Sequence, residues 1–125
     1  MSSGGQSELC TPPPGGDWNG GFNTFSQLKS YLNRELGALP KDYQYHHIVE
    51  QSQIKKTGFD PTDVHNINNV VPMTKELHER ISGYYSSIDP TLSKTMIVRD
   101  WLANQDFQKQ LEFGIRVLRK YGVAI

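Results

Sequence analysis

The sequence predicts an α+β fold in which a small ββα core is flanked by helices on its N- and C-terminal sides. Over Tyr43–Val49 the side chains alternate in polarity and many are aromatic or β-branched, which favours a short strand that ends near the pair His46–His47. Asn69–Met73 offers a second short strand, which Pro72 stops. Apolar residues at helical spacing follow this second strand and also occur in both flanks of the chain.

Length and composition limit the number of domains and the class of protein. Its 125 residues leave room for one small domain, and 36% hydrophobic with 21% charged residues suits a soluble globular protein. There is no apolar run long enough to cross a bilayer and no signal-peptide pattern, and the lone Cys10 cannot form a disulfide within one chain. Because 13 basic residues balance 13 acidic ones, bulk charge alone would not hold a nucleic acid. Phosphate binding would need a local basic patch or a metal ion.

The first part of the chain reads as a flexible leader or linker over residues 1–21, because Gly, Ser and Pro12–Pro14 cannot bury enough apolar surface to fold alone. Such a leader could also join the domain to a larger upstream protein. The folded domain is expected over residues 22–125.

The N-terminal helix is expected to begin at an Asn23 or Thr24 cap and to end at Gly37. One face of it carries regularly spaced apolar residues, namely Phe25, Leu28, Leu32 and Leu36.

Between the strands, Gln51–Gly58 suggests a short helical turn, and Asp60–Asp63 is a turn cluster. After the second strand, Thr74 is a plausible helix cap. The inner face of that helix would be formed by Leu77, Ile81 and Tyr84 or Tyr85.

The C-terminal part is expected to be helical from Asp89–Thr91 onward, with a longer amphipathic helix from Phe107 to Tyr121 that Gly122 stops. The tail has more basic than acidic residues, which gives either a basic edge or an ordinary solvated helix face.

All the histidines of the chain fall between Tyr43 and Tyr85: His46, His47, His65 and His78. His46 and His47 are neighbours on an extended segment, so their rings should point to opposite sides of the strand. His78 lies in the first turn of the helix that folds back over the strands. In one arrangement His46 and His78 hold a divalent ion, while His47 stays free beside it as a general base near pH 7.

This set of residues suits phosphodiester hydrolysis. A bound ion would neutralise charge on the phosphate and on the leaving 3′ oxygen, and His47 would take a proton from the attacking water. The side-chain amide of Asn69 could tie the loop backbone in place.

The chain resembles the HNH, or ββα-metal, endonucleases, and among them the toxin nucleases at the C-termini of bacterial polymorphic toxins, including Rhs-type proteins. The resemblance is carried by three segments, Tyr45–Gln51, Asn66–Pro72 and Leu77–Ile81. It implies that His46 and His78 are metal ligands, that His47 is the general base and that Asn69 is the middle asparagine of the motif. Colicin-type relatives carry another histidine one turn after His78, where this chain has Ser82.

The resemblance also implies partners and a place of action. These are a DNA substrate cleaved to 5′-phosphate and 3′-hydroxyl ends, a larger N-terminal delivery protein, a cognate immunity protein, and action of the secreted effector in the target-cell cytoplasm. Water, a phosphate oxygen or His65 would complete the metal shell, and the ion could be Mg²⁺, Mn²⁺, Zn²⁺ or Ni²⁺. His65 could instead be a phosphate contact or a loop residue that bonds to backbone. The cations nearest the motif in sequence, which could touch flanking phosphates, are Lys55, Lys56 and Arg80.

Three other readings remain. One is a module without catalysis that is stapled by zinc through His46, His65 and His78, although structural zinc sites usually include cysteine. Another is a toxin on the same scaffold that cleaves RNA. The last is a helical interaction module in which the histidines are incidental.

Overall fold

The computed structural model describes residues 19–125, in which helices and one small antiparallel sheet are combined. The predicted α+β class is therefore confirmed. The helices are α2 (Phe25–Leu36), α3 (Gln53–Thr57), α4 (Pro61–Val64), α5 (Lys75–Tyr85), α6 (Val98–Leu102) and α7 (Phe107–Lys120), with a 3₁₀ turn η1 (Ile67–Asn69). The strands are β1 (Tyr43–His47) and β2 (Val70–Thr74). No helix in this part of the chain is long and apolar enough to cross a membrane.

The two strands pair antiparallel, from Tyr43 opposite Thr74 to His47 opposite Val70. The prediction that Pro72 stops the second strand is wrong, since β2 continues through it to Thr74. Pro72 is tolerated there because its side chain is exposed and each strand of a two-stranded sheet is an edge. The helix α5 starts directly after β2, where the Thr74 hydroxyl accepts a hydrogen bond from the Leu77 N–H at 3.2 Å. It lies against both strands.

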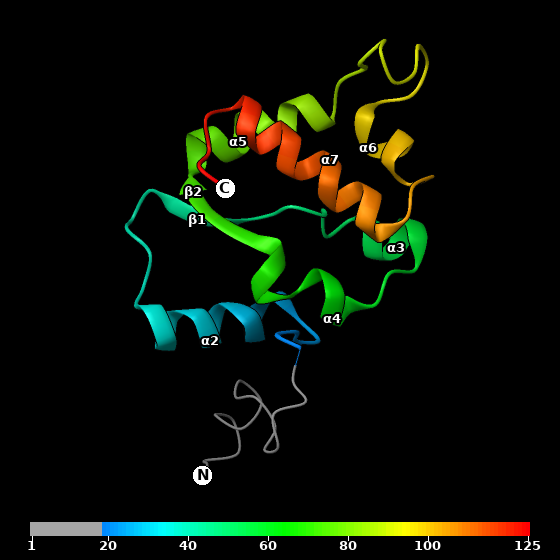
Figure 1. The fold of residues 1–125 in the computed structure, drawn as a ribbon. Helices are drawn as coiled ribbons and strands as arrows, with labels where there is room; N and C mark the ends of the chain where they lie inside the picture. The colour runs from blue at the N-terminus through cyan, green and yellow to red at the C-terminus, as the bar shows by residue number, and fades with distance from the viewer. Residues whose placement is uncertain (1–18) are drawn as a thin grey trace.

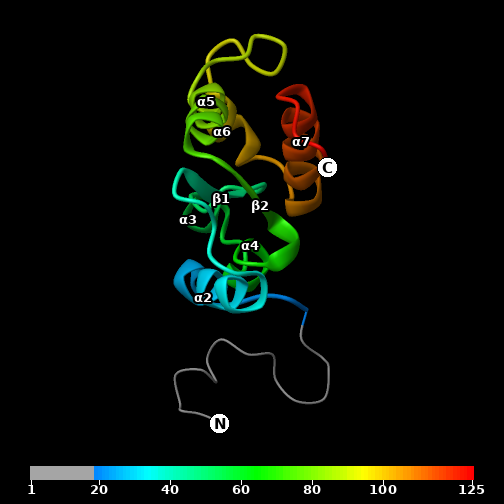
Figure 2. The same ribbon diagram turned by 90° about the vertical axis from the view of Figure 1, so that its left-hand side faces the viewer.

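Two hydrophobic clusters hold the helices to this hairpin. The larger joins α5, α6 and α7 to the strands through Ile48, Met73, Ile81, Tyr85, Val98, Leu102, Phe113, Val117 and Leu118. The smaller joins α2 to β1 through Phe22, Leu28, Leu32 and Tyr45. Figures 1 and 2 both show the hairpin between α2 on one side and α5 to α7 on the other.

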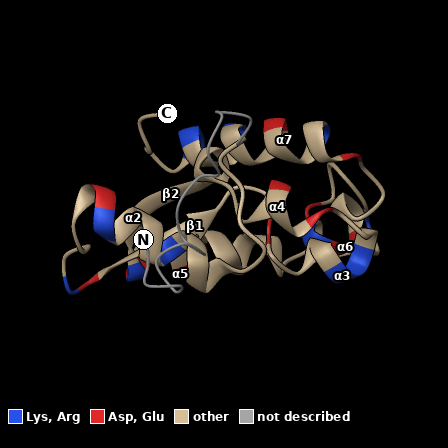
Figure 3. Ribbon diagram, turned by 90° about the horizontal axis from the view of Figure 1, so that it is seen from below, with Lys and Arg blue, Asp and Glu red and all other residues tan. Residues whose placement is uncertain are grey.

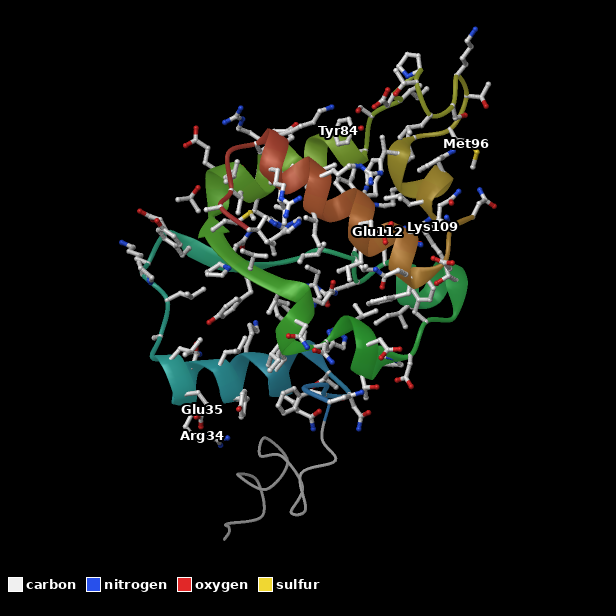
Figure 4. All side chains as sticks on the ribbon, in the orientation of Figure 1. Arg34, Glu35, Tyr84, Met96, Lys109 and Glu112 are labelled. Carbon is white, nitrogen blue, oxygen red and sulfur yellow. The ribbon has the colours of Figure 1, made fainter. Side chains whose placement is uncertain are left out.

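The helix α2 is bounded as the sequence predicts. The Thr24 hydroxyl caps its start by accepting from the Gln27 N–H, and Gly37, with a φ of 86°, ends it. Arg34 and Glu35 point away from the hairpin (Figure 4). Figure 3 shows basic and acidic residues interspersed along the helices in that view, as expected for a chain without net charge.

The helix α7 passes very close to the residue that follows β1. A Cβ atom at Gly114 would lie 2.6 Å from Ile48 Cγ2 and 2.7 Å from the Ile48 carbonyl oxygen. A glycine is therefore needed for this approach.

The first strand ends at His47, within the histidine pair as predicted, and the backbone of Val49 bonds to the Asn69 side chain and not to β2. Two other predictions are wrong. The Asp60–Asp63 cluster forms the short helix α4, which Asp60 caps. Residues 89–91 do not open a helix: Asp89 accepts hydrogen bonds from Thr91, Ile88 bridges to Ile97, and the helix begins only at Val98.

The expected leader covers residues 1–21, of which residues 1–18 lie outside the described part of the chain, as does Cys10. Its last residues are joined to the fold. Gly21 pairs with Asn66, the Ile67 N–H donates to the Gly20 carbonyl at 3.0 Å, and the Phe22 N–H donates to the His65 carbonyl at 2.8 Å.

Candidate functional site

The rings of His46 and His78 meet between β1 and α5. Their Nδ1 atoms are 3.1 Å apart, and the His46 side chain is almost fully buried. Nitrogen ligands bind zinc at about 2.0–2.1 Å, so two of them on one ion lie roughly 3.0–3.4 Å apart. The spacing of this pair, together with the donor chemistry of imidazole, therefore fits a shared divalent cation.

His47 points to the other side of β1, as expected for neighbours on a strand. Its Nε2 lies 3.3 Å from Nδ1 of His65, the residue that ends α4. The Phe25 ring of α2 meets the His47 ring edge to face, with centroids 4.5 Å apart, and stacks on the His65 ring at 6.1 Å. The structure thus makes His65 the partner of His47.

Burial lowers the pKa of all four rings, and neighbouring rings lower that of His46 and His47 further. Burial, followed by the charge of His78, lowers the pKa of His46 to about 4. Burial, followed by the charges of His65, His46 and His78, lowers the pKa of His47 to about 3. Burial also lowers the pKa of His65, and it lowers that of His78 against the opposing effect of Glu50 and Glu79.

All four histidines are therefore neutral at pH 7, which is the form that binds metal or accepts a proton. In the protein without substrate, the pKa of His47 lies well below the value that best suits a general base near pH 7. The cause is its burial among the other rings.

Asn69 fixes the segments that carry His47 and His65. Its side chain is buried, and its Oδ1 accepts a hydrogen bond from the Val49 N–H at 2.9 Å. Its Nδ2 donates to the Val49 carbonyl at 3.1 Å and to the Val64 carbonyl at 2.9 Å. One amide thus joins the chain just after β1 to the end of α4.

A cavity of about 770 Å³ opens beside the rings. Its lining includes His46, His47 and His78, but not His65. The cations in its wall are Lys29 of α2 and Arg99 of α6, and the Glu50 carboxylate in the same wall pairs with Arg99.

The three cations singled out from the sequence lie elsewhere. Lys55 and Lys56 are exposed on α3, and Lys56 pairs with Asp100 at 3.0 Å. Arg80 lies over the Tyr121 ring at 5.7 Å. None of them lines the cavity.

Sequence reasoning missed Lys29, Glu50 and Arg99 as residues of this cavity. For Lys29 the sequence offered one signal: it lies one helical turn after Phe25, so the two side chains were expected to be neighbours on the helix. In the structure its ammonium group lies 4.7 Å from the centre of the Phe25 ring. Glu50 and Arg99 are far apart in sequence, and no local pattern connects them.

Across residues 19–125, no group of three or more His, Cys, Asp or Glu side chains is arranged to hold a metal ion. In that range, two pairs of ring nitrogens have a spacing that suits a shared ion, His46 with His78 and His47 with His65, and only the first pair lines the cavity with both rings. No family model, curated protein or solved structure matches this chain.

Proposed function

We propose that the chain is a metal-dependent HNH endonuclease that hydrolyses phosphodiester bonds of DNA, built on a ββα-metal core formed by β1, β2 and α5. The observation that carries this proposal is the 3.1 Å separation of the Nδ1 atoms of His46 and His78 in the wall of a cavity that His47 also lines. The resemblance noted in the sequence motifs supports it.

His46 and His78 would hold the divalent ion, which neutralises negative charge on the phosphate and on the leaving 3′ oxygen when bound. His47 takes a proton from the attacking water. If Nε2–H of His47 donates to Nδ1 of His65, the lone pair on His47 Nδ1 is left to accept that proton. His65 is then a positioning residue for the base.

The low pKa of His47 fits this role only in the complex. Burial and three neighbouring rings weaken it as a base in the free protein. A phosphodiester in the cavity brings a negative charge close to the ring and acts to raise its pKa, whereas a cation held by His46 and His78 acts to lower it.

The biological setting follows from the same proposal and rests on the resemblance. The domain would be the C-terminal toxin of a bacterial polymorphic toxin used in competition between bacteria. A delivery protein would carry it into the target-cell cytoplasm, and an immunity protein would protect the producing cell.

Digestion of plasmid DNA, single-stranded DNA and RNA with Mg²⁺, Mn²⁺, Zn²⁺ or Ni²⁺ tests the function. We expect DNA cleavage that a chelator abolishes while the fold persists, with 5′-phosphate and 3′-hydroxyl ends. We expect His47→Ala to lose at least about a hundredfold in rate with metal still bound, and His78→Ala to lose metal affinity as well.

The exposed Lys109 on α7 lies outside the cavity, so Lys109→Ala serves as the matched control and should cleave normally. Cleavage by His47→Ala at the normal rate would show that the role given to His47 is wrong. Unfolding by the chelator would favour the zinc-stapled module, and cleavage of RNA alone would favour an RNA-cleaving toxin.

A further inference from the structure

Arg99 is held in one orientation in the cavity wall. Its Nε and Nη2 each donate to a different oxygen of Glu50 at 2.7 Å, and its Nη1 donates to the Ser86 hydroxyl at 2.8 Å. The side chains of Arg99 and Glu50 are only 20% and 16% exposed. Bonds to both carboxylate oxygens fix the plane of the guanidinium group as well as its position.

This guanidinium group still has donors to offer. Arginine carries five N–H groups, and three of them are used in the bonds to Glu50 and Ser86. The other two make no hydrogen bond to a residue in the described range. Arg99 lines the same cavity as His46, His47 and His78, so a ligand in that cavity can meet both the guanidinium group and the histidines.

The surroundings of the ion pair contain a spare donor. The Tyr85 hydroxyl is the only buried side-chain polar atom without a hydrogen-bond partner in residues 19–125. Burial raises its pKa, the charges of Glu50 and Tyr84 raise it further, and the charge of Arg99 lowers it, so it lies near both members of the pair.

We propose that Arg99 is a phosphate-binding residue of this site, which grips an oxygen of the phosphodiester backbone next to the histidine pair. This inference rests on the proposed nuclease function. The planar fork of arginine matches phosphate geometry, and its charge cannot be lost by deprotonation. The competing explanation is that the ion pair only clamps α6 to the segment after β1, in which case it affects stability alone.

Binding of a short DNA duplex in chelator, measured by fluorescence anisotropy across a salt series, separates the two explanations. All proteins carry His47→Ala so that no cleavage occurs. Because a lone Arg99→Gln leaves Glu50 without its partner, the main variant is Glu50→Gln with Arg99→Gln, which keeps the net charge. We expect it to bind DNA about tenfold more weakly, with the slope of log affinity against log salt reduced by about 0.9.

Two further variants complete the design. Arg99→Lys keeps the charge without the fork, and its affinity should fall between those of the parent and the double variant. Arg116→Gln removes an exposed arginine of α7 that lies outside the cavity, and its affinity and salt slope should stay close to those of the parent.

Thermal melts show whether each variant is folded. A folded double variant that binds DNA with the parent's affinity and salt slope overturns the inference and leaves Arg99 as a clamp. If the double variant does not fold, Arg99→Lys with parental affinity and slope overturns it equally. Failure of the nuclease function is distinguishable, since the unsubstituted chain would then cleave no nucleic acid with any metal.

Discussion

Asn69 is the residue on which the arrangement of His47 and His65 depends most directly. Replacing it with alanine leaves the Val49 N–H and the carbonyls of Val49 and Val64 without their side-chain partner in a buried region. We expect Asn69→Ala to lower the free energy of unfolding by about 2–4 kcal/mol, measured by urea denaturation.

The neighbouring Asn68 provides the control, because its side chain is exposed. Asn68→Ala should change the free energy of unfolding by less than about 0.5 kcal/mol. Equal effects of the two substitutions would contradict the structural role given to the amide of Asn69.

At this scale the sequence was informative about His46, His47, Asn69 and His78, because their residue types and spacing are visible in the chain. It left His65 ambiguous. The contact between His65 and His47 depends on where α4 and η1 set the loop, and a sequence pattern does not specify that position.

At the scale of the helices and strands, the crossing of α7 over the residue after β1 leaves no room for a side chain at Gly114. An alanine at Gly114 would collide with Ile48 through both a side-chain and a backbone atom. We expect Gly114→Ala to lower the free energy of unfolding by about 1–3 kcal/mol, because helix and strand must move apart.

Gly83, in the helix α5, is the matched control. A Cβ atom there meets nothing within 4 Å. Gly83→Ala should therefore raise the free energy of unfolding by about 0.5–1 kcal/mol, since alanine favours the helix. Thermal melts of the two variants moving in the same direction would show that this account of the helix crossing is wrong.

The helices and strands with clear apolar spacing or caps were predictable, as α2, β2 and α5 illustrate. The boundaries that failed are decided by contacts distant in sequence or by local side-chain bonds. The second strand continues past Pro72 because it pairs with β1 along an edge, and residues 89–91 form an Asp89-capped turn in place of a helix start.

For the molecule as a whole, the buried histidines predict acid sensitivity in the metal-free protein. The folded-state pKa values of His46 and His47 are about 4 and about 3, below the value of 6.5 for an unperturbed histidine. On acidification the unfolded chain takes up these protons first. Stability should therefore be constant above about pH 7 and fall as the pH decreases from 6.5 toward 4.

Each of these histidines should lower the free energy of unfolding by up to roughly 1.4 kcal/mol per pH unit below about pH 6. Urea denaturation in chelator at a series of pH values measures this slope. His47→Gln should reduce the slope by about one proton, and a flat profile between pH 7 and pH 5 would contradict the burial of neutral rings.

The cavity is formed by elements that are distant in sequence, which is why the sequence analysis did not identify its cations. Lys29 and Arg99 come from α2 and α6, and they share one cavity only after both helices have docked on the hairpin. Lys55, Lys56 and Arg80 are closer in sequence to the histidines but lie outside that cavity.

The pairing of Gly21 with Asn66, next to the bond from the Phe22 N–H to the His65 carbonyl, also fixes how tension enters the protein. A pull on the N-terminus reaches these bonds before it reaches the cluster that joins α5, α6 and α7. A force applied at the N-terminal end would thus act first on the loop that carries His65. The contact between His65 and His47 would break while most of the fold is still intact.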